Sequence, residues 1–361
     1  MQEVLSYDEL SKKIHAVQGR VFFVSGKTFE LSDIESKLQL DQNPNYTRFA
    51  NFEENPNLED LVHALDIFRK SKASIIIALG GGTAIDLAKL IKYYSETDID
   101  KYVVEPIISS PLSSPIEIVA IPSTFGTGSE STHFSVLYIQ GKKFSIADDI
   151  MLPDSYLLDY TLSYTLPEKV KGSACLDALC QAIESYWSVS ATLDSRKLAR
   201  EAISLIIDNY NLYLKGDVSA SKNIATAANL SGKAINKTKT TAAHALSYAL
   251  TSFYGIAHGH AVALCIKNMF NVNMDKARDE GNQECCSSML EIYSLLKVCD
   301  GTEASQLIEK YMEASGLLSR LSDYKKLSPV EVEKIVASVN LERLSNHPVS
   351  LSSSDMMKLF D

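Results

Sequence analysis

The feature that most constrains the fold is a glycine-rich turn between an apolar run and a helix. Residues 73–79 are largely apolar and read as a buried strand, and residues 84–92 have helical spacing. Glycines let the backbone approach an anion, and the free N–H groups of a helix N-terminus face it. We therefore predict a pyrophosphate-binding turn, although a plain structural turn is the alternative. The residues that we assign to it are Gly80, Gly81, Gly82 and Thr83, and Asp86 in the following helix is assigned to the cofactor as well.

An earlier strand-like run, Arg20–Val24, is followed by Gly26 and Lys27. In a dinucleotide-binding unit, a carboxylate just after such a strand holds the ribose 2′-hydroxyl and repels a 2′-phosphate. Gly26 leaves that place open and Lys27 adds positive charge, which favours NADPH over NADH as the cofactor. The alternative is a turn glycine followed by a solvated lysine.

A third apolar run, Ile116–Ile121, leads into a loop rich in hydroxyls and glycines. Such a loop can line a ligand by hydrogen bonding without adding charge, although a structural turn has the same composition. Because strands and helices alternate to about residue 165, we expect a mostly parallel sheet with helices on both faces. The further residues that we assign to the cofactor are Ser123, Thr124, Thr127 and Lys143.

From Pro167 onward, strand signals nearly vanish and long amphipathic helices follow one another. A chain of 361 residues is too long for one ordinary core, so two domains are expected. We predict a dinucleotide-binding α/β domain at residues 1–166 and a helical metal-binding and substrate domain at residues 167–361. The active site is expected in the cleft between them.

Three donor side chains in the helical part form a candidate metal site: Asp177, His244 and His258. A carboxylate and two imidazoles bind a divalent metal and leave a coordination position open. Gln181 lies one helical turn after Asp177, and Tyr248 one turn after His244. His258 is expected in or just after a loop. The alternative is that both histidines are satisfied core residues.

Composition limits the class of partner. The net charge of −10 argues against nucleic acid or an anionic membrane as a partner and leaves small molecules. No apolar run approaches the ~20 residues of a membrane span, and the N-terminal residues lack the layout of a signal peptide. We therefore expect a cytoplasmic protein. Its six cysteines show no CxxC spacing and are expected to be reduced.

These motifs resemble, in order, the successive motifs of the iron-containing (group III) alcohol dehydrogenases. The matching stretches are Gly80–Lys89, Ile121–Glu130, Asp177-Ala-Leu, His244, His258-Gly and Asn346-His-Pro348. The resemblance implies an N-terminal Rossmann-like α/β domain with an all-α C-terminal domain, a dehydroquinate synthase-like architecture. It also implies NAD(P)H-dependent interconversion of an aldehyde and an alcohol, with Fe²⁺ or Zn²⁺ bound. We expect a homo-oligomer, namely a dimer.

In the family, four side chains usually hold the metal, and they match Asp177, Gln181, His244 and His258. The chain departs from the pattern because Gln181 stands where the family has a histidine. An amide oxygen is a poor ligand for a borderline ion, so the site either has three protein ligands or binds metal weakly. Gln181 would then orient the ion or a bound water. Tyr248 likewise replaces a histidine that many members place near the nicotinamide.

Within the family, residues 233–263 look most like the phosphonoacetaldehyde reductase branch, which makes 2-hydroxyethylphosphonate. Lys237 and Lys239 lie among threonines shortly before His244. A phosphonate needs positive charge and several donors at short range, which favours these lysines as its ligands. The alternative is a solvated helix start.

The expected chemistry is hydride transfer to an aldehyde whose carbonyl oxygen is polarised by the metal. His260 or Tyr248 is then the expected source of the proton for the alkoxide. Two other classes stay open: a lyase like dehydroquinate synthase, and a non-catalytic dinucleotide-binding protein with a decayed metal site.

Overall fold

The computed structural model describes residues 2–17, 20–40, 46–100, 102–107, 114–339 and 341–360. The chain divides into two compact units. The first consists of Met1–Thr124 and Gly128–Thr165, and the second of Phe125–Thr127 and Leu166–Asp361. The short segment joins the second unit because Gly126 packs against the backbone of Ala174, where an added Cβ would lie 2.7 Å from the carbonyl oxygen. Among the described residues, no helix is both long and apolar enough to cross a membrane.

The first unit is built on a sheet whose strands all pair in parallel. The strands are Glu3–Val4 (β1), Val21–Val24 (β2), Tyr46–Phe49 (β3), Ile75–Gly80 (β4), Glu117–Pro122 (β5) and Ser155–Tyr156 (β8). Their order across the sheet is β1-β8-β5-β4-β2-β3. Every residue of β4 is buried. A continuous apolar run is what a central parallel strand needs, because helices cover both of its faces.

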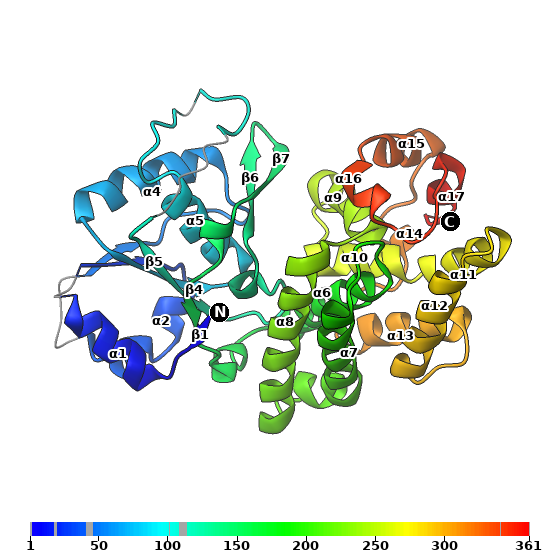
Figure 1. Cartoon of the computed structure of the whole chain (residues 1–361), viewed down its shortest axis with the longest axis horizontal. Helices are drawn as coiled ribbons and strands as arrows, with labels where there is room; N and C mark the ends of the chain where they lie inside the picture. Colours follow the sequence, from blue (N-terminus) through cyan, green and yellow to red (C-terminus); the bar gives the residue numbers. More distant parts are fainter. Residues whose placement is uncertain are drawn as a thin grey trace. The chain divides into compact units, whose positions relative to one another are not determined.

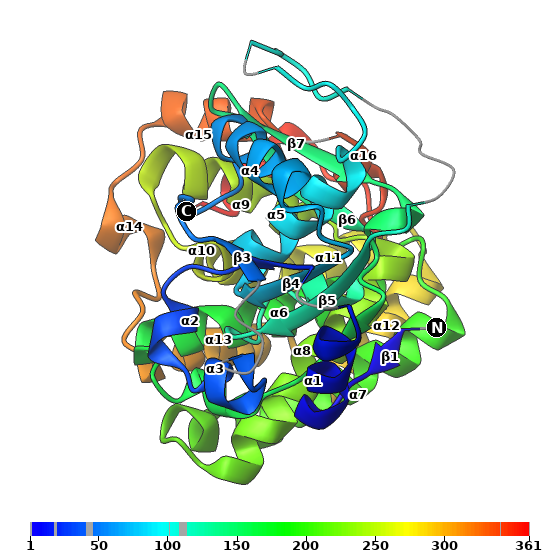
Figure 2. The same cartoon turned by 90° about the vertical axis from the view of Figure 1, so that its left-hand side faces the viewer.

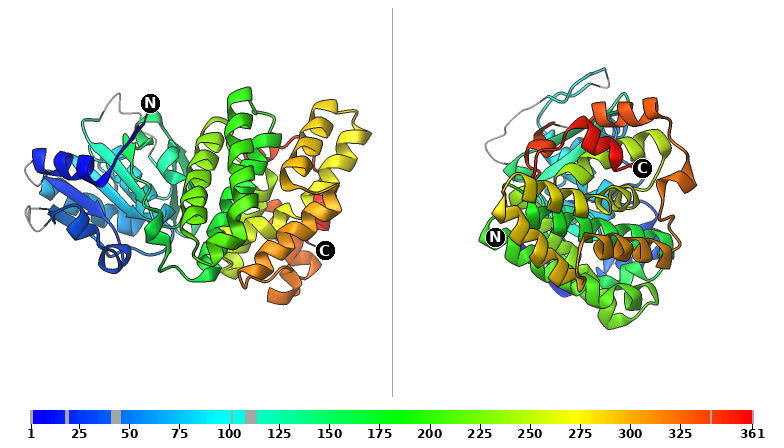
Figure 3. Two further views of the ribbon diagram at one scale, coloured as in Figure 1. Left: turned by 90° about the horizontal axis from the view of Figure 1, so that it is seen from below. Right: turned by 90° about the vertical axis from the view of Figure 1, so that its right-hand side faces the viewer.

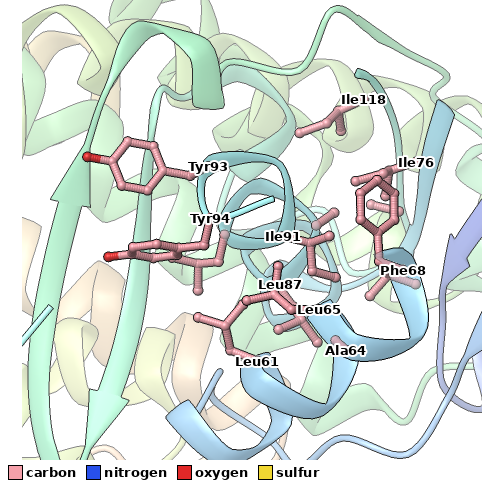
Figure 4. Packing of buried hydrophobic residues seen from close by; sticks show 14 of the residues in the cluster. Leu61, Ala64, Leu65, Phe68, Ile76, Leu87, Ile91, Tyr93, Tyr94 and Ile118 are labelled. Atoms are coloured by element: carbon pink, nitrogen blue, oxygen red, sulfur yellow. The ribbon is translucent and has the colours of Figure 1, made fainter. Parts of the chain in front are cut away.

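Helices cover the two faces of this sheet, as expected from the alternating pattern (Figure 1). One face packs on Leu58–Ser71 (α4) and Gly82–Tyr93 (α5), and the other on Tyr7–Ala16 (α1), Thr28–Leu31 (α2) and Ile34–Lys37 (α3). On the α4–α5 side, Leu65 and Phe68 meet Ile76 of β4 and Ile91 of α5 in a continuous apolar cluster (Figure 4). Asn57 starts α4 by accepting a hydrogen bond from the backbone N–H of Asp60.

An antiparallel hairpin, which the sequence analysis did not predict, lies outside the main sheet. It consists of Phe134–Ile139 (β6) and Lys142–Ala147 (β7) (Figure 2). β6 packs against α5. The turn between the strands, Gln140-Gly141, has positive φ at both residues, as a tight hairpin turn requires.

The described part of the second unit contains helices joined by loops and no strand. Its helices are Glu168–Trp187 (α6), Leu193–Leu214 (α7), Val218–Thr238 (α8), Ala242–Tyr254 (α9), His258–Ile266 (α10), Met269–Asp279 (α11), Gln283–Leu296 (α12), Gly301–Ala314 (α13), Leu321–Tyr324 (α14), Pro329–Ala337 (α15), Leu341–Ser345 (α16) and Ser353–Lys358 (α17). The long helices α6, α7 and α8 lie side by side (Figure 3). Nearly the whole of α6 is buried, so it is the central helix of this unit.

His258 lies just after a loop, as expected, and begins a helix of its own. Gly255 adopts the left-handed conformation that ends α9, with φ of 66°, and Ala257 is the N-cap of the next helix. His258 is therefore the first residue of α10. A helix fixes the direction of this side chain more closely than a loop would.

Candidate metal centre

Three helices of the second unit bring the predicted metal ligands together. Asp177 lies on α6, His244 on α9 and His258 on α10. Each can offer one ligand atom, and these atoms all lie within 4.8 Å of one another. Asp177 and His244 are buried, whereas His258 is partly exposed. The cluster thus combines two fixed donors with one that faces a more open side.

A glycine allows the close approach of α10 to α6. A Cβ on Gly259 would lie 2.0 Å from the carbonyl oxygen of Ser173 and 2.7 Å from the Cβ of Asp177. No other residue fits between the two helices at this point. His258 is therefore held beside Asp177 by the packing of its neighbour in the chain.

His244 is held from both sides by carboxylates. Its Nε2 lies 3.2 Å from Oδ1 of Asp177, and its Nδ1 is in a short hydrogen bond with Oε2 of Glu184. The other oxygen of Glu184 accepts hydrogen bonds from the backbone N–H of Thr241 at 3.1 Å and of Ala243 at 3.0 Å. Because Thr241 gives α9 no side-chain cap, Glu184 satisfies the free N–H groups of the first turn.

The electrostatics follow from this arrangement. Burial opposes charge on all three groups, but the attraction between the His244 ring and the two carboxylates is stronger. It lowers the pKa of Asp177 and of Glu184 and raises the pKa of His244 to about 9. The two carboxylates thus favour the protonated form of the ring while no ion is bound.

The donor set fits a divalent cation. One carboxylate and two imidazoles match the three-ligand sites that catalytic metals occupy. The contact between Glu184 and Nδ1 directs Nε2 of His244 toward Asp177, which is how a carboxylate orients a ligating histidine. Asp177, His244 and His258 are therefore the residues that could hold the ion.

Gln181 lies beside this group, on the same face of α6 as Asp177. Its Oε1 accepts a hydrogen bond from Oγ of Ser231 at 3.0 Å, and its amide also hydrogen-bonds to the Asp177 carboxylate. It is buried.

The two predicted proton donors lie in different surroundings. The ring of Tyr248 stacks on that of His258, with centroids 5.8 Å apart. His260 is fully buried, and its ring nitrogens contact the carbonyl oxygen of Leu318 at 2.7 Å and the hydroxyl of Tyr324 at 3.0 Å. The structure places Tyr248 against His258, one of the three predicted metal ligands, and does not bring His260 into their group.

The glycine turn of the first unit has the expected form. Gly80 ends β4, Gly81 is the N-cap of α5, and Gly82 and Thr83 form its first turn. Thr124 lies against Gly81, because a Cβ there would be 3.2 Å from its methyl group. These residues surround a helix N-terminus at the carboxyl end of a parallel strand, where dinucleotides bind in folds of this type.

The other residues assigned to the cofactor lie in different parts of the fold, and Ser123 and Asp86 make hydrogen bonds within the protein. The backbone N–H of Ser123 donates to the carbonyl of Gly80. The two carboxylate oxygens of Asp86 accept from Oγ of Ser129 at 2.5 Å and from the N–H of Val136 at 3.0 Å, which ties α5 to β6. Lys143 lies on β7, and Thr127 belongs to the second unit. Contact of these residues with a cofactor stays a prediction.

Gly26 and Lys27 follow β2 as expected. The guanidinium of Arg48 donates to the carbonyls of Ser25 at 3.0 Å and of Gly26 at 2.7 Å, so it clamps this turn. Lys27 is exposed.

The two lysines assigned to the phosphonate lie at the end of α8. Lys237 is in its last turn and Lys239 is its C-cap, and both are exposed. Their contact with a substrate is likewise a prediction.

Sequence reasoning missed Glu184 and Ser231. Glu184 stands seven residues after Asp177, two turns along one helix face, and this spacing could have revealed it. Ser231 has no comparable signal, because only the packing of α8 on α6 brings it to Gln181.

Comparison with known proteins agrees with this geometry. A model of the iron-containing alcohol dehydrogenase family matches residues 2–160, and a model of the C-terminal region of Fe-containing alcohol dehydrogenases matches residues 172–361. The chain belongs to the iron-containing alcohol dehydrogenase family. Members of this family use NAD(P)H and a divalent metal.

Among its relatives, the phosphonoacetaldehyde reductase of Streptomyces viridochromogenes is 31% identical over 60% of this chain and 58% of its own length. The sulfoacetaldehyde reductase of Bilophila wadsworthia is 30% identical over 60% of this chain and 57% of its own length. The matched stretch is thus less than two thirds of either relative. The structure of an iron-containing alcohol dehydrogenase from Thermotoga maritima is 26% identical, with a TM-score of 0.79 over 99% of this chain and 96% of that one.

Proposed function

We propose that this protein is a metal-dependent aldehyde reductase that uses NAD(P)H, preferentially NADPH, and converts phosphonoacetaldehyde to 2-hydroxyethylphosphonate. The observation that carries the proposal is the group of Asp177, His244 and His258, two of them buried, whose ligand atoms lie within 4.8 Å of one another. In a family of NAD(P)-linked alcohol dehydrogenases, such a group is suited to hold the catalytic ion.

Each residue of the cluster has a distinct task in this proposal. Asp177, His244 and His258 bind the ion, and Glu184 keeps the proton on Nδ1 of His244 so that Nε2 is free to coordinate. When bound, the ion polarises a carbonyl group and the nicotinamide supplies hydride. The chain itself contributes orientation and a largely dry environment, since Asp177 and His244 are buried.

Tyr248 is the residue that we propose as the proton donor to the product oxygen. Its ring stacks on that of His258, one of the three predicted metal ligands, with centroids 5.8 Å apart. In this proposal the phenol hydroxyl gives its proton to the product oxygen directly or through one water, as general-acid catalysis requires. His260 is the weaker candidate, because both of its ring nitrogens contact other groups.

An anionic head group on the substrate is supported by the lysines at the end of α8 and by the relatives. Lys237 and Lys239 are exposed and stand five or more residues before His244. The two relatives described above are named for two-carbon aldehydes that carry a phosphonate or a sulfonate. Positive charge near the carbonyl would favour such substrates over uncharged ones.

The test compares NADPH oxidation with phosphonoacetaldehyde and with an uncharged aldehyde of similar size. We expect a clear preference for the phosphonate in kcat/KM, which K237Q and K239Q reduce by on the order of tenfold each while the uncharged aldehyde is unaffected. K222Q is the matched control, because Lys222 is an exposed lysine on the same helix. Equal rates with both aldehydes would still support an aldehyde reductase, but would contradict phosphonoacetaldehyde as its preferred substrate.

A homodimer and a cytoplasmic location remain part of the proposal. Light scattering of the purified protein tests the first, and fractionation of the source cells tests the second.

A further inference from the structure

The orientation of the Gln181 amide suits the protein without a metal and would be unfavourable with a cation bound. Its Oε1 accepts from Oγ of Ser231 at 3.0 Å, which leaves the amide NH₂ as the end that hydrogen-bonds to the Asp177 carboxylate. This orientation is favourable without a metal, because a carboxylate accepts hydrogen bonds and carries negative charge. It is unfavourable beside a cation, because the NH₂ end of an amide carries partial positive charge.

Ser231 can hydrogen-bond to the Gln181 amide in either orientation of that amide. Its Oγ lies 2.9 Å from the carbonyl oxygen of Ala178 as well as 3.0 Å from Oε1 of Gln181. A hydroxyl has one proton and two lone pairs, so it cannot donate fully to two acceptors at once. If the amide turns over, its NH₂ donates to Oγ of Ser231, and Ser231 gives its proton to Ala178 alone. Every polar group is then satisfied, and Oε1 faces the metal ligands.

We propose that Gln181 turns its amide over when a divalent cation binds to Asp177, His244 and His258, so that Oε1 becomes a fourth ligand and Ser231 holds the NH₂ group. The two ends of an amide have nearly the same size, so the turn needs no space beyond what the side chain already fills. This inference rests on the metal centre of the proposed function.

The consequence is a centre with two oxygen and two nitrogen donors from protein. Amide oxygens are established ligands of divalent cations, although they donate less strongly to borderline ions than imidazole does. Replacing a histidine by Gln181 therefore keeps four protein ligands and lowers the affinity for the ion. Ser231 acts as a positioning residue, since it touches the amide and not the ion.

The test is Co²⁺ binding to metal-depleted protein, measured by competition with a chromophoric chelator and by the visible spectrum of the bound ion. Q181M keeps the length of the side chain but removes both polar ends. We expect it to weaken binding by on the order of tenfold to a hundredfold and to change the Co²⁺ spectrum. S231A should weaken binding in the same direction and by less. S221A is the matched control, because Ser221 is a buried serine of the same helix that donates to the carbonyl of Asp217.

The outcomes separate this inference from the proposed function. Unchanged Co²⁺ affinity and an unchanged spectrum in Q181M would show that Gln181 is no ligand, and would overturn the inference while leaving a three-ligand centre. Absence of Co²⁺ binding by the wild-type protein, or full binding by D177A, would overturn the metal centre and the inference together. Far-ultraviolet circular dichroism of each variant checks that loss of binding does not come from unfolding.

Discussion

Glu184 holds the Nδ1 edge of His244 with one carboxylate oxygen and the first turn of the helix that carries His244 with the other. A single buried side chain on α6 thus fixes both the start of α9 and the direction of a predicted metal ligand. The position of the ring is therefore set before any ion binds.

Replacing Glu184 by Gln tests this relationship. The neutral amide oxygen accepts from Nδ1–H more weakly than a carboxylate does, so His244 is held less firmly in its preferred tautomer and orientation. We expect affinity for a divalent ion to fall by on the order of tenfold to a hundredfold. E309Q is the matched control, because Glu309 pairs with Lys267 at a partly exposed position. Equal metal affinity of E184Q and E309Q would show that Glu184 has no part in the centre.

Gly259 is predicted to tolerate no side chain. A Cβ would lie 2.0 Å from the carbonyl oxygen of Ser173, so G259A must push α10 away from α6. In an open helix, glycine to alanine is stabilising by roughly 1 kcal/mol. Here we expect destabilisation by about 1–3 kcal/mol, seen as a lower Tm, together with weaker metal binding. A261G serves as a control in the same helix, since it inserts no atom. A Tm of G259A at or above the wild-type value would contradict the packing described.

His347 is predicted to make the second unit sensitive to acid. Burial lowers its pKa to about 4, and the Glu184 carboxylate offsets this only in part. In the unfolded chain, the value is near 6.5. Between these two pH values the unfolded state binds more protons, so the free energy of unfolding falls as pH decreases from about 6.5 to about 4, by on the order of 3 kcal/mol.

The measurement is urea unfolding followed by tryptophan fluorescence. Trp187 is the one tryptophan of the chain, and its ring centroid lies 5.9 Å from that of His347. H347Q removes the titrating group and should therefore make the free energy of unfolding less dependent on pH between about pH 4 and about pH 6.5. An identical pH dependence in H347Q and wild type would rule out His347 as its source.

The cofactor preference is predicted to depend on Gly26. A Cβ there would meet only an ordinary contact, 3.7 Å from the ring of Phe52, so a longer side chain fits. G26D places a carboxylate where the 2′-phosphate of NADPH is expected, and repulsion should lower kcat/KM for NADPH by on the order of tenfold or more relative to NADH. S36D adds the same charge at an exposed position of α3. If the ratio of kcat/KM for NADPH to kcat/KM for NADH changes equally in G26D and S36D, the turn after β2 does not contact the ribose of the cofactor.

Much of the fold could be predicted because its signals are local. The strand, glycine turn and helix at β4 and α5, and the amphipathic α7, lie where periodicity placed them. The hairpin of β6 and β7 was missed because its strands, although as long as β4 and β5, are only partly buried and so lack a continuous apolar run.

The candidate site could be predicted in part. Asp177, His244 and His258 were found because metal-ligand chemistry restricts the residue types, and the structure brings them together. The partners that orient them come from helices that are adjacent only in the folded chain. Thr241 and Ser231 are polar residues without distinctive spacing, and their contacts with Glu184 and Gln181 depend on packing against α6.

The most direct measurement is NADPH oxidation by metal-depleted protein in the presence of phosphonoacetaldehyde, before and after addition of Fe²⁺ or Zn²⁺. We expect oxidation only after an ion is restored, and a fall of at least about a hundredfold in H244A, because the ion then loses a ligand that both carboxylates orient. Undiminished oxidation in the metal-depleted protein, or in H244A, would contradict a reductase whose ion is held at this site.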